Sequence, residues 1–209
     1  MVPYPFKQFL CLRKRVKCLG HGHSALYLDH ARVSRYVALE PNALMHKHIR
    51  AQANRAGFHE SDGTLIILSC GAEDTKSILD ALPSPQTQAP PIDTIISIMT
   101  LCTIPEPQKI VSNLVRDVLG PGGELLIYEH VLSPRHDVAW WQKFWAPVWA
   151  VVFDGCRMDR PSDVLMRELG IRDGDGTMGS AWREWKTWGK EGDDEENLFW
   201  HSVGRFIKR

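Results

Sequence analysis

The sequence predicts one α/β domain whose central strands are covered by helices on both faces. Strand-like and helix-like segments alternate from Val33 onward, which is the pattern of such domains. The run TIISIM at residues 94–99 is apolar and β-branched, as expected of a buried parallel strand. A chain of 209 residues, 44% hydrophobic and 24% charged, is long enough for one such core, and this composition excludes a disordered or fibrous protein.

The first half of the chain is predicted to hold three strands around one long helix. Pro41 and Asn42 are typical of a helix start, and Gly57 is placed to end that helix. A stretch rich in proline and glutamine at residues 83–91 predicts a surface loop. The predicted strands are residues 35–40 (RYVALE), 65–69 (LIILS) and 94–99 (TIISIM), and the last should be central in the sheet.

The second half continues the alternation. Apolar residues recur at helical spacing after Pro107, and the glycines and proline of residues 120–123 should end that helix. The remaining predicted elements are a strand at 124–130 (ELLIYEH), an aromatic segment at 138–153 and a strand at 198–207 (LFWHSVGRFI).

Charge and cysteine content exclude several classes of protein. Lys plus Arg equals Asp plus Glu at 25 each, so no bulk field attracts nucleic acid. Five cysteines without a CxxC pair argue against a disulfide framework and favour a reducing compartment. Neither a secretion signal nor a transmembrane segment is recognisable, so we expect an intracellular, cytoplasmic protein. Peripheral membrane contact and the oligomeric state stay open.

A short glycine loop is followed by an acidic residue at an informative distance. Gly20 and Gly22 lie in the loop LGHGHS, and Glu40 comes twenty positions after Gly20, at the end of the next strand. In nucleotide-binding α/β domains the glycines let the backbone approach the ligand, and such an acid binds ribose hydroxyls. The loop alone is also compatible with an ordinary strand-to-helix turn, and Glu40 makes that alternative weaker.

Four motifs resemble those of class I S-adenosylmethionine-dependent methyltransferases. They are ALEPN at 38–42, CGAED at 70–74, DTIISIMTLCTI at 93–104 and VLGPGGELLIYEHV at 118–131. The stretch WWQKFWAPVWAVVFDGC at 140–156 is similar to the methyltransferase-like group whose animal members methylate thiols, close to the ubiquinone and menaquinone methylases.

This resemblance covers about residues 16–209, after a short N-terminal segment at 1–15. It implies a doubly wound, Rossmann-like and largely parallel seven-stranded sheet with its last strand antiparallel, and S-adenosyl-L-methionine as cofactor. Glycines would face the methionine part of the cofactor, Glu40 the ribose, residues 71–73 the adenine, and residues 99–101 the rest of the pocket. The cofactor-binding residues implied are Gly20, Gly22, Glu40, Gly71, Ala72, Glu73, Met99, Thr100 and Leu101.

The first motif departs from the family pattern. Val16 stands where the family has an acid at the end of its first strand, and Cys18 stands at the first glycine. Arg15 and Lys17 would then lie in a strand buried on both faces, at a cost of several kcal/mol for an unpaired charge. The sequence therefore predicts a truncated or altered start.

Two residues are candidates for catalysis. His130 ends the strand ELLIYEH, and a histidine can accept a proton near neutral pH. Asp154 follows the aromatic segment and would border the pocket. Each has an alternative role in a turn. Cys18, His21 and His23 offer too few ligands facing one way, so no metal site is expected.

These observations predict methyl transfer to a small, apolar acceptor, with a thiol favoured over oxygen or carbon. Two alternatives stay open: a scaffold protein that binds no cofactor, and a nicotinamide-dependent oxidoreductase. The aromatic segment is compatible with a core helix, an interfacial surface or a lid, and we favour a lid kinked at Pro147. The acceptor should bind between this segment and the ends of the fourth and fifth strands.

Overall fold

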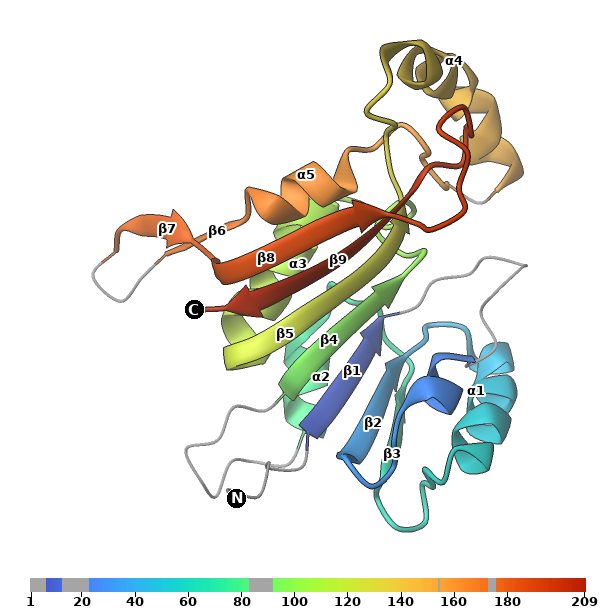
Figure 1. Cartoon of the computed structure of the whole chain (residues 1–209). Coiled ribbons are helices and arrows are strands. Elements are labelled where there is room, and N and C mark those ends of the chain that lie inside the picture. Colours follow the sequence, from blue (N-terminus) through green and yellow to red (C-terminus); the bar gives the residue numbers. More distant parts are fainter. Residues whose placement is uncertain (1–6, 13–22, 83–91, 154, 173–175) are drawn as a thin grey trace.

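A computed structural model describes residues 7–12, 23–82, 92–153, 155–172 and 176–209. Seven strands form one mixed sheet in the order β3-β2-β1-β4-β5-β9-β8, with strand β4 in the middle as predicted (Figure 1). Strands β1 to β5 are parallel to their neighbours in this group, whereas β9 is antiparallel to both β5 and β8. The strands are β1 (Lys7–Leu12), β2 (Val33–Leu39), β3 (Leu65–Leu68), β4 (Ile92–Ile98), β5 (Leu119–His130), β8 (Trp182–Gly189) and β9 (His201–Lys208).

Helices cover both faces of this sheet, so the α/β class is confirmed (Figure 1). Successive residues of β2 alternate between two buried clusters: Tyr36 belongs to the one that includes residues of η1 and α1, and Val37 to the one that includes residues of α2, α3 and α5. The helices are η1 (His23–Tyr27, a 3-10 helix), α1 (Ala43–Arg55), α2 (Thr75–Ala81), α3 (Pro107–Asp117), α4 (His136–Val152) and α5 (Ser162–Arg167).

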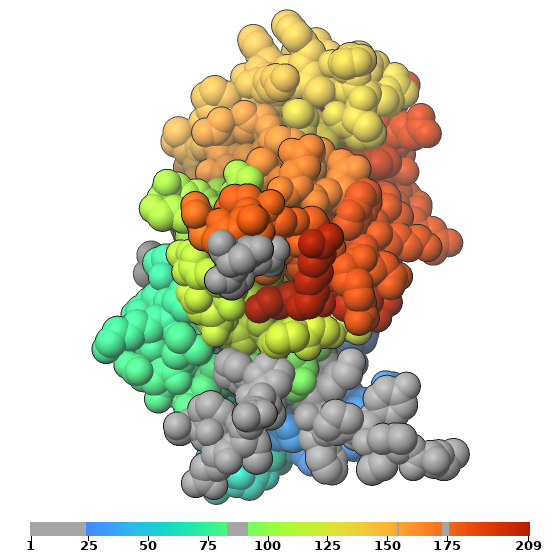
Figure 2. Space-filling view, turned by 90° about the vertical axis from the view of Figure 1, so that its left-hand side faces the viewer, coloured from blue at the N-terminus to red at the C-terminus, as the bar shows by residue number. Residues whose placement is uncertain are grey.

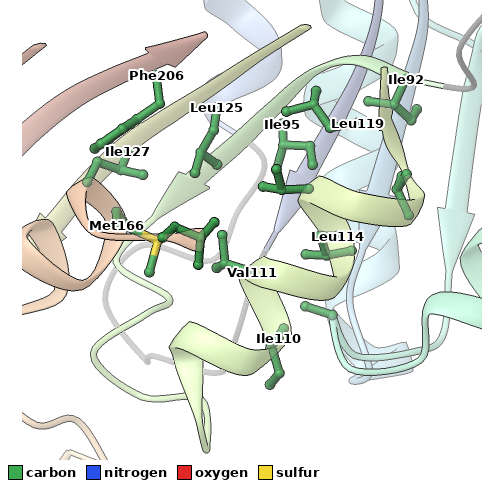
Figure 3. Close-up of a cluster of buried hydrophobic side chains, with 14 of the residues drawn as sticks. Ile92, Ile95, Ile110, Val111, Leu114, Leu119, Leu125, Ile127, Met166 and Phe206 are labelled. Carbon is green, nitrogen blue, oxygen red and sulfur yellow. The ribbon is translucent and has the colours of Figure 1, made fainter. Parts of the chain in front are cut away.

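The larger buried cluster joins α3 to the central strands. Ile110 and Leu114 lie one helical turn apart on α3 and belong to the same buried cluster as Ile95 of β4 and Leu125 of β5 (Figure 3). Met166 of α5 closes the same cluster. This packing fixes the ends of β4 and β5, from which the residues of the candidate site project.

The first strand lies earlier than predicted. We expected it to end near Val16, but β1 spans Lys7–Leu12 and pairs with both β2 and β4. The segment KQFLCL is the more apolar choice, because residues 13–17 carry four cations that a central strand would have to bury. The sheet therefore includes a strand from the segment 1–15, and the departures noted at Val16 and Cys18 lie outside the described residues.

Several short elements were not predicted. Helix α2 is only seven residues long, although Asp74 caps it by accepting the Ser77 N–H at 3.0 Å. Strand β8 reads WREWKTWG, in which the tryptophans recur at every third residue and only Trp182 is buried, so the two-residue alternation of a half-buried strand is missing. A second, two-stranded sheet pairs β6 (Gly170–Arg172) with β7 (Met178–Ser180). The sequence 120–123, predicted to separate helix from strand, belongs to β5 itself.

Candidate functional site

The predicted site residues follow the carboxyl ends of four parallel strands, which lie at one edge of the sheet (Figure 1). Doubly wound sheets bind their ligands at this edge. Glu40 follows β2, residues 71–73 follow β3, residues 99–101 follow β4, and His130 ends β5. Gly20, Gly22 and Asp154 lie outside the described residues.

Glu40 is a buried acid with one unused oxygen. Its side chain is 1% exposed, and Oε1 accepts the backbone N–H of Asn42 at 2.8 Å. Oε2 is also buried and has no hydrogen-bond partner among the described residues. A buried carboxylate oxygen without a donor is costly, and the two hydroxyls of a ribose would supply donors. Glu40 therefore fits the role that the resemblance gives it.

Residues 71–73 form a tight turn after β3. A Cβ atom on Gly71 would lie 2.3 Å from the carboxylate oxygens of Glu73, so a side chain at this position would require the exposed Glu73 carboxylate to move. Ala72 is buried, whereas Glu73 is exposed and folds back over Gly71. Gly71 is therefore half-buried beneath the Glu73 carboxylate, which remains in contact with solvent.

Glu129 holds the turn after β4 in place. Its carboxylate accepts the Thr100 N–H at 2.9 and 3.0 Å, the Leu101 N–H at 3.0 Å and the Ser97 hydroxyl at 2.7 Å. Met99 begins this turn with a φ of 52°, a left-handed conformation that is uncommon outside glycine. Glu129 was not among the predicted site residues, yet it holds the backbone of Thr100 and Leu101.

The hydrogen bonds of Glu129 also determine which of residues 99–101 is accessible. Thr100 and Leu101 are buried, with their N–H groups on Glu129, and Leu101 packs in the main core. Met99 is half-buried and its N–H donates to the Tyr128 carbonyl at 2.8 Å. Burial raises the pKa of Glu129 to about 7, because desolvation outweighs the three donors.

Two cysteines and a histidine meet beside this turn. We call Cys102, His130 and Cys156 the thiol–histidine cluster. The two Sγ atoms are 3.5 Å apart, and the Cys156 Sγ is 3.9 Å from the His130 Nδ1. All three ligand atoms lie within 4.8 Å of one another, with both cysteines buried and the histidine half-buried. Cys102 follows β4 and His130 ends β5, so neighbouring parallel strands bring them together.

The pKa values of the two thiols in this cluster are shifted in opposite directions. The pKa of Cys156 is lowered to about 5, chiefly by its hydrogen bond with Cys102, and also because His130 and the Trp149 indole N–H lie nearby. The pKa of Cys102 is raised by the same hydrogen bond and by burial near Glu129. Cys156 is therefore the more acidic of the two thiols.

Helix α4 divides into two parts with different surroundings. Its first part carries a self-packed ring cluster that faces solvent, with Trp140 57% and Trp145 43% exposed. Farther along, Trp149 stacks on Phe153 at 3.7 Å and contacts Phe199 at 4.7 Å, and Phe199 in turn contacts His130. The atoms of α4 form one end of the molecule (Figure 2). Only the carboxyl part of the aromatic segment therefore reaches the thiol–histidine cluster.

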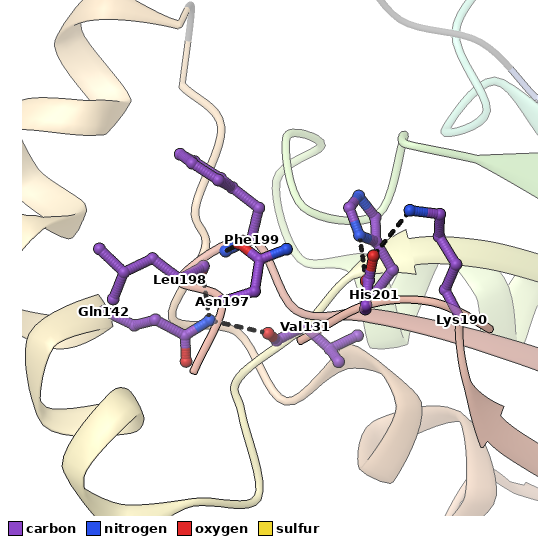
Figure 4. A network of polar contacts seen from close by, with 8 residues as sticks. Val131, Gln142, Lys190, Asn197, Leu198, Phe199 and His201 are labelled. Atoms are coloured by element: carbon purple, nitrogen blue, oxygen red, sulfur yellow. Dashed lines mark hydrogen bonds and ion pairs between the residues drawn. The ribbon is translucent and has the colours of Figure 1, made fainter. Parts of the chain in front are cut away.

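One buried glutamine attaches α4 to the sheet. Gln142 accepts the Ser133 N–H at 2.7 Å and donates to the carbonyls of Val131 at 3.1 Å and Leu198 at 2.9 Å (Figure 4).

Pro147 lies within α4, which continues past it to Val152. Among the described residues, no helix is long and apolar enough to cross a membrane.

The fold and this edge define a class of α/β protein that binds a nucleoside-containing cofactor at its parallel strand ends. A family model described as a methyltransferase domain matches residues 18–127. This match takes in more than half of the chain, which therefore belongs to the S-adenosylmethionine-dependent methyltransferase family.

Curated relatives are similar over a shorter stretch. Human thiol S-methyltransferase TMT1B is 37% identical over 70 residues, which are 33% of this chain and 28% of the relative. Human thiol S-methyltransferase TMT1A is 32% identical over 75 residues, 34% of this chain and 29% of the relative. These matches thus span less than a third of each relative's length.

Solved structures show the same fold at low identity. The N-methyltransferase NodS from Bradyrhizobium japonicum, in complex with S-adenosyl-L-homocysteine, has a TM-score of 0.55 and 10% identity, covering 97% of this chain and 78% of its own. Geranyl diphosphate methyltransferase, in complex with S-adenosylmethionine, has a TM-score of 0.62 and 9% identity, covering 98% of this chain and 79% of its own.

Proposed function

We propose that this protein transfers a methyl group from S-adenosyl-L-methionine to a small, apolar thiol. The observation that carries the proposal is Glu40, whose buried Oε2 lacks a donor at the end of β2 in a fold of this family. When bound, the cofactor supplies an electrophilic methyl group. The chain has to bind the cofactor, align the acceptor with that methyl group and exclude water.

The residues that follow the strand ends would each have a role in binding the cofactor. Glu40 would accept hydrogen bonds from the ribose hydroxyls, and the turn at Gly71 would lie against the adenine. Met99, fixed by the turn that Glu129 clamps, would contact the remainder of the cofactor. These roles would bring the methyl group to the ends of β4 and β5, where His130 and Cys102 lie.

The preference for a thiol rests on the relatives and on the surroundings of His130. TMT1A and TMT1B are thiol S-methyltransferases by name. Around His130 the described groups are the aromatic rings of Phe199 and His201 and the sulfur of Cys156, which suit a soft, apolar nucleophile. A thiol is already partly ionised near neutral pH and needs less help from a base than a hydroxyl does.

Calorimetry with S-adenosyl-L-homocysteine tests cofactor binding directly. We expect saturable binding, and we expect Glu40→Gln to weaken it by about 10- to 100-fold, because hydrogen bonds to a charged group contribute about 1.5 to 3 kcal/mol. Glu60→Gln is the matched control, since Glu60 forms an exposed ion pair with Arg50 and should leave binding unchanged. No binding to the wild-type chain would instead indicate a scaffold protein.

A series of three aromatic acceptors tests the choice of atom. Thiophenol, phenol and aniline share one ring and present sulfur, oxygen and nitrogen to the methyl group. We expect methyl transfer to thiophenol to be the fastest, measured as S-adenosyl-L-homocysteine formed. Faster transfer to phenol or aniline would reject a thiol as the favoured acceptor.

A further inference from the structure

We propose that Cys102, His130 and Cys156 bind a zinc ion whose fourth coordination position takes the sulfur of the acceptor. The role of the fourth position rests on the proposed thiol methyl transfer, whereas the metal site stands on the cluster alone. Three protein ligands with one open position are the arrangement of catalytic zinc sites, and two cysteines with one histidine are a known set.

The spacing of the ligand atoms fits a tetrahedral ion. Zinc–sulfur bonds of about 2.3 Å and zinc–nitrogen bonds of about 2.0 Å place tetrahedral ligand atoms roughly 3.5 to 3.8 Å apart. The Sγ atoms of Cys102 and Cys156 are 3.5 Å apart, and the Cys156 Sγ is 3.9 Å from the His130 Nδ1. With all three atoms within 4.8 Å, a shift of the His130 ring by about 1 Å completes the geometry.

The charges of the cluster also favour a divalent cation. A coordinating thiol loses its proton outright, so both cysteines would bind the metal as thiolates. Two thiolates and one zinc ion sum to zero charge, which suits two cysteines that are both buried.

The position of the cluster links the metal to the reaction. Cys102 follows the turn of residues 99–101, and His130 ends the neighbouring strand, so an open ligand position would lie where the methyl group is expected. The acceptor S–H proton would pass to water as its sulfur binds the zinc. A sulfur–carbon bond then forms to the methyl group while the bond from that carbon to the cofactor sulfur breaks with its electron pair. The neutral thioether product is a weaker ligand than the thiolate and leaves.

Cobalt provides a spectroscopic test on the whole chain. The chain, kept reduced and stripped of metal with a chelator, is titrated with Co²⁺ while its absorption spectrum is recorded. We expect one ion per chain, a thiolate-to-cobalt charge-transfer band, visible bands typical of tetrahedral cobalt, and displacement by one equivalent of Zn²⁺. A titration without these bands overturns the metal site.

Variants connect the spectrum to the three residues. Cys156→Ser and Cys102→Ser should each weaken cobalt binding by more than the roughly 10- to 100-fold that loss of an outer partner costs. Cys70→Ser is the control, because Cys70 is a partly buried free cysteine outside the cluster. Circular dichroism verifies that each variant is folded. Retention of the full spectrum in both cluster variants overturns the assignment.

Adding thiophenol to the cobalt-loaded chain tests the fourth position. We expect the visible bands to shift with thiophenol and to stay unchanged with phenol, and an unchanged spectrum with thiophenol overturns acceptor coordination. Calorimetry with S-adenosyl-L-homocysteine on the metal-free chain separates this result from the proposed function. Cofactor binding without cobalt bands rejects the zinc site alone, whereas cobalt bands without cofactor binding reject the methyltransferase activity.

Discussion

The carboxylate of Glu129 accepts the backbone N–H of Thr100 through both of its oxygens, at 2.9 and 3.0 Å. This contact joins the end of β5 to the turn after β4, and it is buried. The same carboxylate accepts the Leu101 N–H, so a single side chain sets the backbone path that leads from β4 to Cys102.

Glu129 should make stability depend on pH. Its pKa is raised from 4.5 to about 7 on folding, so between these values the folded chain keeps a proton that the unfolded chain has lost. The free energy of unfolding should therefore fall by up to about 1.4 kcal/mol per pH unit across this window as pH rises. Glu129→Gln lacks this contribution, so its stability deficit relative to wild type should be larger near about pH 5 than near about pH 8 in urea unfolding.

A control at an exposed acid separates this effect from a general pH response. Glu106 is largely exposed, so Glu106→Gln should change the free energy of unfolding by no more than about 1 kcal/mol in the same measurements. A deficit of Glu129→Gln that is the same at about pH 5 and about pH 8 would show that Glu129 is ionised in the folded chain throughout this window.

Gln142 should contribute more to stability than its neighbour on α4. Gln142→Leu leaves the Ser133 N–H and the carbonyls of Val131 and Leu198 without their partner, and we expect a loss of about 2 to 4 kcal/mol. Faster amide exchange along α4 should accompany that loss. Lys143 is exposed, so Lys143→Gln should stay within about 0.5 kcal/mol of wild type. Similar values for both variants would contradict an anchoring role for Gln142.

Arg160 ties the turn after β4 to the segment that follows α4. Its Nη1 donates to the carbonyls of Leu101 at 3.0 Å and Ile104 at 2.6 Å, and burial lowers its pKa. Arg160→Met should lower the free energy of unfolding by about 2 kcal/mol, because two carbonyls lose a charged donor. Arg157 pairs with Asp159 at the surface, so Arg157→Met should cost about 0 to 1 kcal/mol in the same denaturant titration. The Arg160 assignment fails if the order of the two losses is reversed.

The sequence predicted the strands and helices with strong periodicity or strong boundaries. Strand β4 is a continuous apolar run, α3 carries its buried residues at helical spacing, and α1 begins after Asn42, whose side chain caps it. Strand β1 was misplaced because a six-residue segment has too few residues to show a period. The antiparallel strand β9 was expected from the resemblance and is present.

Only part of the candidate site could be predicted from the sequence. Glu40 was found because its distance from the glycine loop is a local signal. Cys102 and His130 end neighbouring parallel strands, and this relation could have brought them together once the strand order was assumed. Cys156 lies 54 positions from Cys102, and no spacing rule connects them before the chain is folded. Glu129 was read as part of a strand end, because its hydrogen bonds depend on the left-handed turn at Met99.

The two parts of α4 should respond differently to loss of a tryptophan. Trp149 is half-buried and packs on Phe153 and Phe199, so Trp149→Ala should lower the free energy of unfolding by about 2 kcal/mol. Trp145 is 43% exposed, so Trp145→Ala should stay within about 0.5 kcal/mol of wild type. Both should keep S-adenosyl-L-homocysteine affinity, because Glu40 and residues 71–73 follow other strands.

The same pair of variants tests where the acceptor lies. Through Phe199, Trp149 is connected to His130, whereas the Trp145 ring packs on Phe144 in the exposed cluster. With variants compared below their melting temperatures, Trp149→Ala should raise the KM for thiophenol by about tenfold, the effect of losing roughly 1.4 kcal/mol of acceptor contact. Trp145→Ala should leave KM unchanged. An equal rise in both would mean that the whole aromatic segment covers the acceptor, as the sequence alone suggests, and that the exposed rings close over it during turnover.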